Sequence, residues 1–212
     1  MGLLDLITGF GLSSSAGLNA YIPLLAVALL ARAGELRLAE PFAWLASDEV
    51  LLALFVLLLI EFFVDKIPGV DFLNDVIQTF VRPAAGAIAF AMSAGIITDL
   101  SPTLALIIGL FPAAGVHAVK MTTRPAVNLL TMGIGAPFVS FAEDVSAVLG
   151  VVLAILLPIL FLVFAFILAI VVWQLVRYAR GRQRDRALAR AYAYQHPYYP
   201  ARYPPRYPPY RP

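Results

Sequence analysis

Long apolar segments alternate with short polar ones through the first 176 residues of the chain. A helix needs about 20 predominantly apolar residues to cross the hydrocarbon core of a bilayer. Proline removes a backbone hydrogen-bond donor, so Pro158 is expected to kink the last and longest of these segments. The pattern predicts about six membrane helices, at residues 12–32, 50–65, 84–98, 102–120, 125–142 and 146–176.

Three parts of this region depart from the pattern of a simple apolar helix. Residues 13–20 and 133–137 are rich in Gly, Ser and Pro, whereas residues 66–83 place apolar side chains at helical spacing opposite a polar face. Irregular backbone is tolerated at membrane depth only where protein or water satisfies its hydrogen bonds. We therefore expect broken or half helices, with residues 13–20 and 66–83 spanning the bilayer, re-entering it or lying at its interface.

Composition supports a membrane location. Of the 212 residues, 61% are hydrophobic and 13% are charged, whereas soluble domains are about 45–50% apolar and about 25% charged. Polar residues are too few to cover a water-soluble globule, and the lack of cysteine excludes a disulfide scaffold. The sequence therefore predicts an all-α polytopic membrane protein whose integral helical domain covers residues 1–176.

Charge is distributed unevenly along the chain, and this predicts its orientation. Residues 1–176 contain six basic and twelve acidic residues, whereas residues 177–212 contain nine Arg and one acidic residue. Because basic residues next to a membrane helix stay in the cytoplasm, residues 177–191 are predicted to form a cytoplasmic, Arg-rich juxtamembrane segment. Its side chains from Arg177 to Arg190 either contact anionic lipid headgroups or act only as a stop-transfer anchor.

The same rule assigns the helix ends to the two faces of the membrane. With six helices and both termini inside, the acidic residues fall mostly at outer ends, and the basic residues mostly at inner ends. The inner ends then carry Lys66, Arg82, Lys120 and Arg124, and the outer ends carry acidic residues that include Glu143 and Asp144.

Residues 192–212 have a different composition from the rest of the chain. They contain seven of the sixteen prolines and seven of the nine tyrosines. Such a segment cannot bury a core and favours an extended, disordered conformation. It is interpreted either as a tail that binds a partner or as a solvated extension.

A short string occurs twice. Residues 11–20 align without gaps to residues 109–118, with five identities and with Asn19 opposite His117. With three helices in each half, this duplication predicts a 3+3 inverted repeat with halves 3–98 and 101–176, an architecture of many secondary transporters. The alternative is that both strings of small residues only allow helices to pack closely.

Ionisable residues inside the apolar segments are the candidate functional groups. A charge at a helix centre costs about 2.5–3.5 kcal/mol, so such residues usually pair or line a polar pathway. One helical face carries His117, Lys120 and Arg124. Pro125 is expected to end that helix, and the helix end would then present the planar guanidinium of Arg124 to an anion.

Two sets of candidates follow from this argument. Most of these residues also have an interpretation that involves no substrate: the basic groups extend to the headgroups, Glu143 and Asp144 are loop acids, and the His and Asn side chains only join helices. The predicted substrate-binding residues are Arg124, Lys120, Arg82, His117, Asn19 and Asn128, and the predicted proton-carrying or charge-balancing residues are Asp65, Asp144, Glu143 and Glu61.

Common catalytic signatures are missing from the sequence. His117 and His196 have no metal-ligand spacing, and neither a phosphate-binding loop nor a nucleophile elbow occurs. We therefore expect no catalytic residue, no metal, no cofactor and no nucleic acid partner. The expected partners are the lipid bilayer, further copies of this chain, a larger membrane complex, or a protein that binds the tail.

Several strings resemble one bacterial membrane family. They are residues 15–24 (SAGLNAYIPL), residues 65–68 (DKIP) with Asp71, Arg82-Pro83, and residues 114–120 (AGVHAVK) with Thr123-Arg124-Pro125. The family is labelled domain of unknown function 4126, and the resemblance covers roughly residues 5–170. It implies a polytopic protein of the bacterial inner membrane and brings no activity with it.

Two functional hypotheses remain open from the sequence. The first is an inverted-repeat transporter or flippase-like protein for an anionic or amphiphilic substrate, which could be coupled to protons. The second is a non-catalytic structural or accessory subunit of a larger membrane protein complex.

Overall fold

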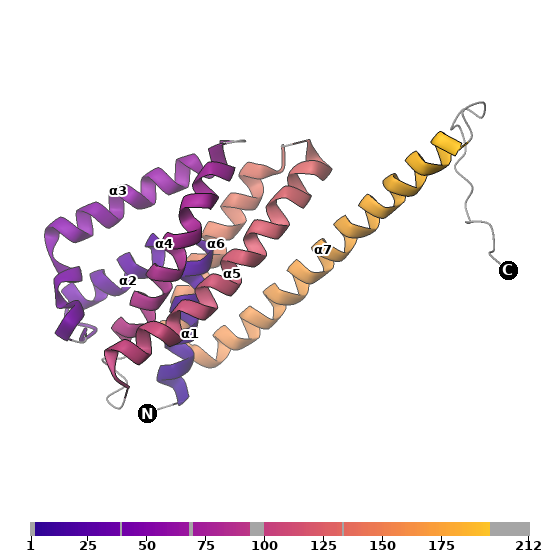
Figure 1. Cartoon of the computed structure of the whole chain (residues 1–212). Helices are drawn as coiled ribbons and strands as arrows, with labels where there is room; N and C mark the ends of the chain where they lie inside the picture. The colour runs from indigo at the N-terminus through magenta and orange to yellow at the C-terminus, as the bar shows by residue number, and fades with distance from the viewer. Residues whose placement is uncertain (1–2, 39, 68–69, 94–99, 133, 196–212) are drawn as a thin grey trace.

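The computed structural model describes residues 3–38, 40–67, 70–93, 100–132 and 134–195. Within these residues the structure contains helices and no strand, which confirms the predicted all-α class. The helices are α1 (Leu3–Leu18), α2 (Tyr21–Arg32), the 3-10 helix η1 (Glu40–Ala46), α3 (Asp48–Val64), α4 (Val70–Ser93), α5 (Pro102–Thr131), α6 (Ala136–Leu156) and α7 (Pro158–Gln195) (Figure 1).

Four helices in the described part of the chain are long and apolar enough to cross a membrane. The remaining α-helices, α1, α2 and α3, contain 16, 12 and 17 residues, fewer than the roughly 20 of a typical span. The chain is thus a helical membrane protein by length and composition, and the predicted count of six spans is not confirmed. The four segments are Leu73–Ser93, Pro102–Pro125, Ala136–Leu156 and Pro158–Leu188.

The predicted span 12–32 consists of two helices, because the chain breaks between α1 and α2. Asn19 lies at this break and is only 1% exposed. Its side-chain oxygen accepts hydrogen bonds from the backbone N–H groups of Tyr21 at 3.1 Å and Ile22 at 3.3 Å. These bonds satisfy donors in the first turn of α2, which have no partner within the helix. The expectation of a broken helix is therefore correct here.

Prolines inside α4 and α5 do not break these helices. α4 continues through Pro83, so residues 70–83 and 84–93 of the two predicted segments share one helix. α5 continues through Pro125, so the end predicted after Arg124 is wrong. An interior proline removes one backbone hydrogen bond, a loss that membrane helices tolerate where neighbouring helices compensate for it. Arg124, the residue before Pro125, forms ion pairs with three acidic side chains.

Pro158 marks a reversal of the chain rather than a kink. The predicted segment 146–176 is divided between α6, which ends at Leu156, and α7, which begins at Pro158. Proline is well tolerated at the first position of a helix because its missing N–H would have no partner within the helix. α6 runs toward the end of the bundle that contains the N-terminus, and α7 returns from there (Figure 1).

Small residues bring α1, α4 and α5 into close contact. A Cβ atom on Gly86 would overlap Ala113, and one on Gly17 would lie 2.6 Å from the Ala113 carbonyl oxygen. Ser13 Oγ donates a hydrogen bond to the Gly109 carbonyl oxygen. The repeated glycine-containing strings therefore form helix-packing surfaces, as the packing interpretation expected.

The direction of these helices bears on the predicted inverted repeat. Ser13 of α1 contacts Gly109 of α5. Farther along both helices, the Leu18 carbonyl oxygen of α1 accepts a hydrogen bond from Lys120 Nζ of α5 at 3.1 Å. α1 and α5 therefore run in the same direction (Figure 1). An inverted repeat would place the two aligned strings on helices of opposite direction. The inverted repeat is thus not confirmed.

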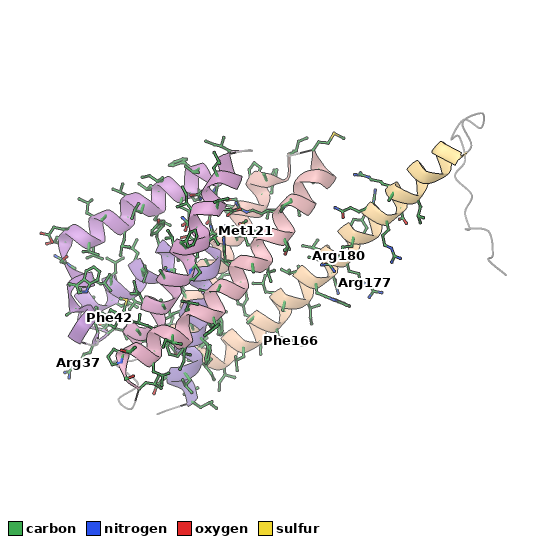
Figure 2. The ribbon with its side chains drawn as sticks, viewed as in Figure 1. Arg37, Phe42, Met121, Phe166, Arg177 and Arg180 are labelled. Atoms are coloured by element: carbon green, nitrogen blue, oxygen red, sulfur yellow. The ribbon has the colours of Figure 1, made fainter. Side chains whose placement is uncertain are left out.

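α7 is covered less by the rest of the protein than the other candidate spans. Only 6% of its apolar stretch is buried, against 28% for α5 and α6 and 56% for α4. From Pro158 to Val176 the helix is about 28 Å long at 1.5 Å per residue, close to the roughly 30 Å hydrocarbon core. Arg177 and Arg180 follow on the part of α7 that extends beyond the bundle (Figure 2).

The predicted Arg-rich segment 177–191 continues α7. Residues 192–195 also belong to this helix, so the predicted disordered tail does not begin at residue 192. Residues 196–212 lie outside the described part of the chain.

Candidate functional site

Eight ionisable side chains meet inside the bundle, and we call them the charge cluster. They belong to α3 and the residue that follows it, and to α4, α5 and α6. Seven are at most 6% exposed, and the side chain of the eighth is 12% exposed. Ionisable groups are almost never buried to this degree unless they are paired. The members are Glu61, Asp65, Asp75, Arg82, His117, Lys120, Arg124 and, as the eighth, Glu143.

Helical spacing explains how these groups come together. α5 contributes His117, Lys120 and Arg124, which lie on one face because they follow one another after three and four residues and because the helix continues past them. α4 contributes two members seven residues apart, and the C-terminal end of α3 contributes two members four residues apart. Each helix therefore directs a short stripe of charge at its neighbours.

Arg82 is the most deeply buried charge and joins α3 to α5. Its Nη2 lies 2.7 Å from Glu61 Oε1, and its Nη1 donates a hydrogen bond to His117 Nδ1 at 3.0 Å. Because a guanidinium can only donate, His117 Nδ1 must be unprotonated, and the imidazole is neutral. His117 Nε2 then donates to Thr79 Oγ1 at 3.1 Å, and that hydroxyl donates to the Asp75 carbonyl oxygen at 2.9 Å.

Lys120 and Arg124 share acidic partners one turn apart on α5. Lys120 Nζ lies 3.0 Å from Asp65 Oδ2, 3.1 Å from Glu143 Oε2 and 3.1 Å from the Leu18 carbonyl oxygen. The contacts with Leu18 and Asp65 are hydrogen bonds, and the contact with Glu143 is an ion pair. Arg124 Nη2 lies 2.7 Å from Asp65 Oδ2, and Arg124 Nε donates to Glu143 Oε2 at 3.1 Å.

A second ion pair lies next to the charge cluster and is closer to the surface. Lys66 Nζ lies 3.1 Å from Asp144 Oδ2, and the two side chains are 22% and 13% exposed. Asn19 Nδ2 donates to Asp144 Oδ1 at 3.1 Å, and Asn74 Nδ2 donates to Asp65 Oδ1 at 2.7 Å. We call Lys66, Asp144 and Asn19 the rim: Lys66 and Asp144 follow the cluster members Asp65 and Glu143 in the chain and are partly exposed, and the buried Asn19 is bonded to Asp144.

The charge state of Asp65 follows from its neighbours. Burial by itself would raise the pKa of this carboxyl, but the positive charges of Lys120 and Arg124 outweigh that effect. The pKa of Asp65 therefore lies well below its ordinary value of 3.8. Asp65 is ionised at neutral pH and balances the charge of the basic groups around it.

These ion pairs correct the predicted assignment of charges to the membrane faces. Glu143 and Asp144 were expected at outer helix ends, and Lys66, Lys120 and Arg124 at inner ends. The two sets are in direct contact, so they lie at the same depth. Glu143 and Asp144 belong to α6 and are not loop acids, and Lys120 and Arg124 are buried in ion pairs and do not extend to headgroups.

The structure brings most of the predicted site residues together. Seven of the ten predicted residues are members of the charge cluster, and Asn19 and Asp144 lie in the rim. Asn128 belongs to α5, but its side chain is outside the described part of the structure.

Sequence reasoning missed Asp75, which pairs with two of the basic groups. Its Oδ2 lies 3.3 Å from Arg124 Nη1, and its Oδ1 lies 3.6 Å from Arg82 Nη1. The signal was present, because residues 66–83 carry a polar face that includes Asp75. The sequence left open whether residues 66–83 span the bilayer, re-enter it or lie at its interface, and the polar face lies against α5 within a membrane-length helix.

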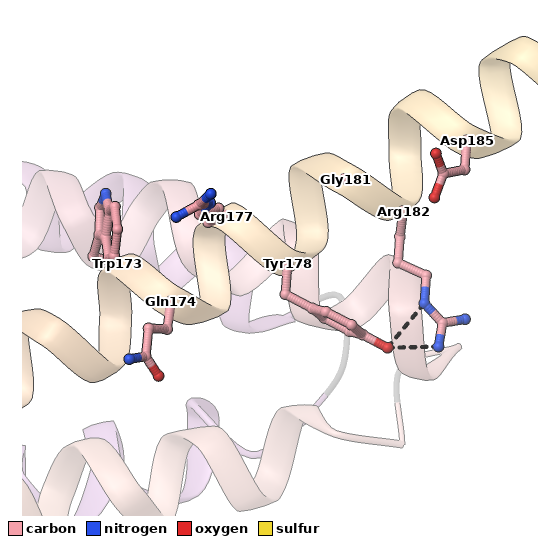
Figure 3. A pocket seen from close by; sticks show the side chains of 7 residues that line it. All are labelled: Trp173, Gln174, Arg177, Tyr178, Gly181, Arg182 and Asp185. Carbon is pink, nitrogen blue, oxygen red and sulfur yellow. Dashed lines mark hydrogen bonds between the residues drawn. The ribbon is translucent and has the colours of Figure 1, made fainter. Parts of the chain in front are cut away.

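A shallow hollow on α7 lies apart from the charge cluster (Figure 3). The guanidinium carbon of Arg177 lies 5.3 Å from the centroid of the Trp173 ring, and Arg182 Nε donates to the Tyr178 hydroxyl at 2.9 Å. Aromatic and basic side chains of this kind are typical of a helix leaving the bilayer. All the lining residues belong to one helix, so the hollow is an open face: Trp173, Gln174, Arg177, Tyr178, Gly181, Arg182 and Asp185.

The described side chains offer charge pairing rather than metal ligation. Among them, no group of three or more His, Cys, Asp or Glu residues is placed to hold a metal ion. The acidic members of the cluster each lie against a basic group instead. The chemistry available in the cluster is therefore the exchange of one ionic partner for another, or of a proton.

Comparison with known proteins gives one match. A family model described as Domain of unknown function (DUF4126) matches residues 6–178, most of the chain, which confirms the resemblance found in the sequence. No curated protein and no solved structure matches.

Proposed function

We propose a function for this chain, which belongs to the family described as Domain of unknown function (DUF4126), from the geometry of its site. It is a membrane transport protein for an anionic substrate. The observation that carries the proposal is the convergence of eight ionisable side chains, seven of them at most 6% exposed, in a bundle with four candidate membrane helices. Such residues are costly in a membrane and usually mark a substrate, ion or proton pathway.

Arg124 and Lys120 are the groups that recognise the anion in this proposal. A guanidinium presents a planar fork of donors that matches a carboxylate or phosphate, and an ammonium adds a compact point charge. The two groups lie one turn apart and already share acidic partners, so their donors converge. In this proposal the anion approaches past the rim, where Lys66 and Asp144 are 22% and 13% exposed.

Proton coupling is the second part of the proposal. The cluster contains four carboxyl groups, three basic groups and a neutral His117, so by count it carries one more acidic than basic group. Glu61 Oε2 is buried and has no hydrogen-bond partner among the described residues. A proton on a buried carboxylate would remove the excess charge and satisfy such an oxygen, because the protonated form is a donor as well as an acceptor.

We also propose a location and an orientation for the chain. It lies in the bacterial inner membrane, as the resemblance implies, with the Arg-rich end of α7 in the cytoplasm. The side chains from Arg177 to Arg190 contact anionic headgroups there. The cluster then faces the cytoplasm, because α3 and α5 end, and α4 and α6 begin, at the end of the bundle toward which α7 runs (Figure 1).

Transport can be tested with the full chain in liposomes. We would measure uptake of radiolabelled phosphate and acetate, and movement of a fluorescent phosphatidylglycerol between leaflets, with and without a pH gradient. The wild type is expected to move at least one of these probes. Arg124→Gln and Asp65→Asn are expected to lower that rate at least tenfold, because each removes one partner of a buried ion pair.

The control is Arg32→Gln, which removes an exposed arginine paired with Asp48 far from the cluster. This variant should keep the wild-type rate. Each protein would first be checked for helical content and a single size in detergent. If the wild type moves none of the probes, or if the two cluster variants move them as fast as the wild type does, the transport proposal is refuted.

A second candidate function is a non-catalytic subunit of a larger membrane complex, and α7 is the observation that favours it. Only 6% of its apolar stretch is buried, so nearly all of this helix is open to lipid or to a partner, including further copies of this chain. The ion pairs of the charge cluster would then only join helices.

Cross-linking in intact membranes would separate the two functions. Photoreactive groups placed on Phe166 and Leu162, which are 67% and 49% exposed on α7, should capture another protein reproducibly if this chain is a subunit. Deletion of residues 192–212 would show whether the tail helps to hold the partner. Capture of lipid alone would exclude α7 as the subunit surface.

A further inference from the structure

We propose that Glu143 occupies the anion site of this protein, and that an anionic substrate binds by taking the place of Glu143 against Arg124 and Lys120. This inference rests on the proposed transport function and specifies how the substrate enters the same site. The substrate class that follows is a compact oxyanion, a carboxylate or a phosphate group, carried either by a free solute or by a lipid headgroup.

The contacts of Glu143 are those expected of a bound anion. Arg124 Nε donates to Glu143 Oε2 at 3.1 Å and Arg124 Nη2 at 2.5 Å, while Lys120 Nζ lies 3.1 Å from the same oxygen. One carboxylate oxygen is thus held by two cations. A substrate oxyanion could accept the same charge-assisted hydrogen bonds without any movement of α5.

Glu143 is also the carboxylate of the cluster nearest to the surface. Its side chain is 12% exposed, whereas the side chains of Glu61, Asp65 and Asp75 are 1%, 2% and 5% exposed. It is the only member contributed by α6, which packs mainly on α1 rather than on α5. Its release therefore breaks contacts at the edge of the cluster and leaves the packing of α3, α4 and α5 unchanged.

The charge balance allows this exchange. Without Glu143, the three acidic members Glu61, Asp65 and Asp75 face the three basic members Arg82, Lys120 and Arg124. By count any one of the four carboxylates could leave, and the greater exposure of Glu143 makes it the one that is exchanged. Replacing it with a monoanion keeps the net charge of the buried site constant, which avoids the penalty of leaving a buried charge without a partner.

Asp65 cannot take this role, although it contacts the same bases. Its Oδ2 lies 2.7 Å from Arg124, 3.0 Å from Lys120 and 3.6 Å from Arg82. Its displacement would break contacts with all three basic members at once, whereas Glu143 contacts only Lys120 and Arg124. Asp65 is thus the fixed counter-charge and Glu143 the exchangeable one.

Binding of a probe to the Glu143→Gln variant tests the inference. Glutamine keeps the shape of the side chain and removes its charge, so the basic groups become available to an external anion. We would titrate purified full-length protein in neutral detergent with inorganic phosphate and with acetate by calorimetry. Glu143→Gln should bind at least one probe at least tenfold more tightly than the wild type.

Two further proteins complete the test. Asp48→Asn is the matched control, because Asp48 is an acidic residue in an ion pair with Arg32, outside the cluster and 78% exposed; its affinity should stay within twofold of the wild type. The double variant Glu143→Gln/Arg124→Gln should lose the gain in affinity. Native mass spectrometry with phosphatidylglycerol, compared with phosphatidylcholine, would distinguish a lipid headgroup from a free anion as the source of the oxyanion.

The outcomes separate this inference from the transport proposal. If the wild type transports a probe but Glu143→Gln binds every probe no more tightly than the wild type, the displacement of Glu143 is overturned and the transport function stands. If Glu143→Gln binds more tightly but no probe is transported, the anion site stands and the transport proposal fails. A gain that persists in the double variant would also overturn the inference, because Arg124 would not be the binding group.

Discussion

The pair between Arg82 and Glu61 gives the sharpest test of how the buried charges contribute to stability. Arg82 has a fully buried side chain, that of Glu61 is 1% exposed, and Nη2 lies 2.7 Å from Oε1. Removal of one partner from a buried ion pair leaves an uncompensated charge and costs about 3–5 kcal/mol. Arg82→Met should therefore lower the free energy of unfolding by about that amount.

Glu61 carries most of this cost, because the other acidic neighbours of Arg82 keep a basic partner. Asp65 retains Lys120 and Arg124, and Asp75 retains Arg124. The double variant Glu61→Gln/Arg82→Met removes the uncompensated charge. Its loss of stability should be smaller than the sum of the two single losses by about 0.5–3 kcal/mol, the range found for directly coupled residues.

The assay is unfolding in mixed micelles, followed by the helical circular dichroism signal. Wild type, both single variants and the double variant form one cycle, and the coupling free energy is read from their midpoints and slopes. A loss below about 1 kcal/mol for Arg82→Met, or single losses that add to within about 0.5 kcal/mol in the double variant, would show that this buried pair is not the stabilising contact described here.

Three further predictions use the same measurement. The pKa of Asp65 is lower in the folded protein than its ordinary value of 3.8, so its stabilising contribution is fully present above about pH 4 and is lost as the pH falls further. The difference in the free energy of unfolding between wild type and Asp65→Asn should therefore be constant from about pH 5 to 8 and shrink below about pH 4. Gly109→Ala should lower the free energy of unfolding by about 1–3 kcal/mol, because its Cβ would lie 2.7 Å from the Gly86 carbonyl oxygen. Gly115→Ala on the same helix should be neutral or slightly stabilising, because no atom lies within 4 Å of its Cβ position. Arg32→Ala should change stability by less than about 0.5 kcal/mol, because its ion pair is exposed.

Local pattern was enough to identify most of the candidate site. His117, Lys120 and Arg124 share a helix face because of their spacing alone, and their charge inside an apolar segment marked them as unusual. Glu61 and Asp65 were found in the same way at the end of the second predicted span. These residues could be found one segment at a time, because burial of charge is visible in the residues on either side.

Two errors arose where local rules were applied without the neighbouring helices. Pro125 was expected to end α5, but the helix continues through it, and the preceding Arg124 forms ion pairs with acidic residues outside α5. The acidic residues at 143 and 144 were placed on the outer face by a rule that counts charges one helix end at a time. Their contacts with Lys66, Lys120 and Arg124 come from other helices and put them at the same depth.

The sequence alone established an all-α membrane protein, its basic C-terminal end and the ionisable residues that need partners, because hydropathy and helical spacing depend only on residues close together in the chain. The tertiary structure alone decided which charges meet, such as Lys120 with Asp65, 55 residues apart. It also showed that the matching small-residue strings lie on parallel, closely packed helices. The energy of an ion pair or of a helix contact depends on a distance between segments, and no local pattern contains that distance.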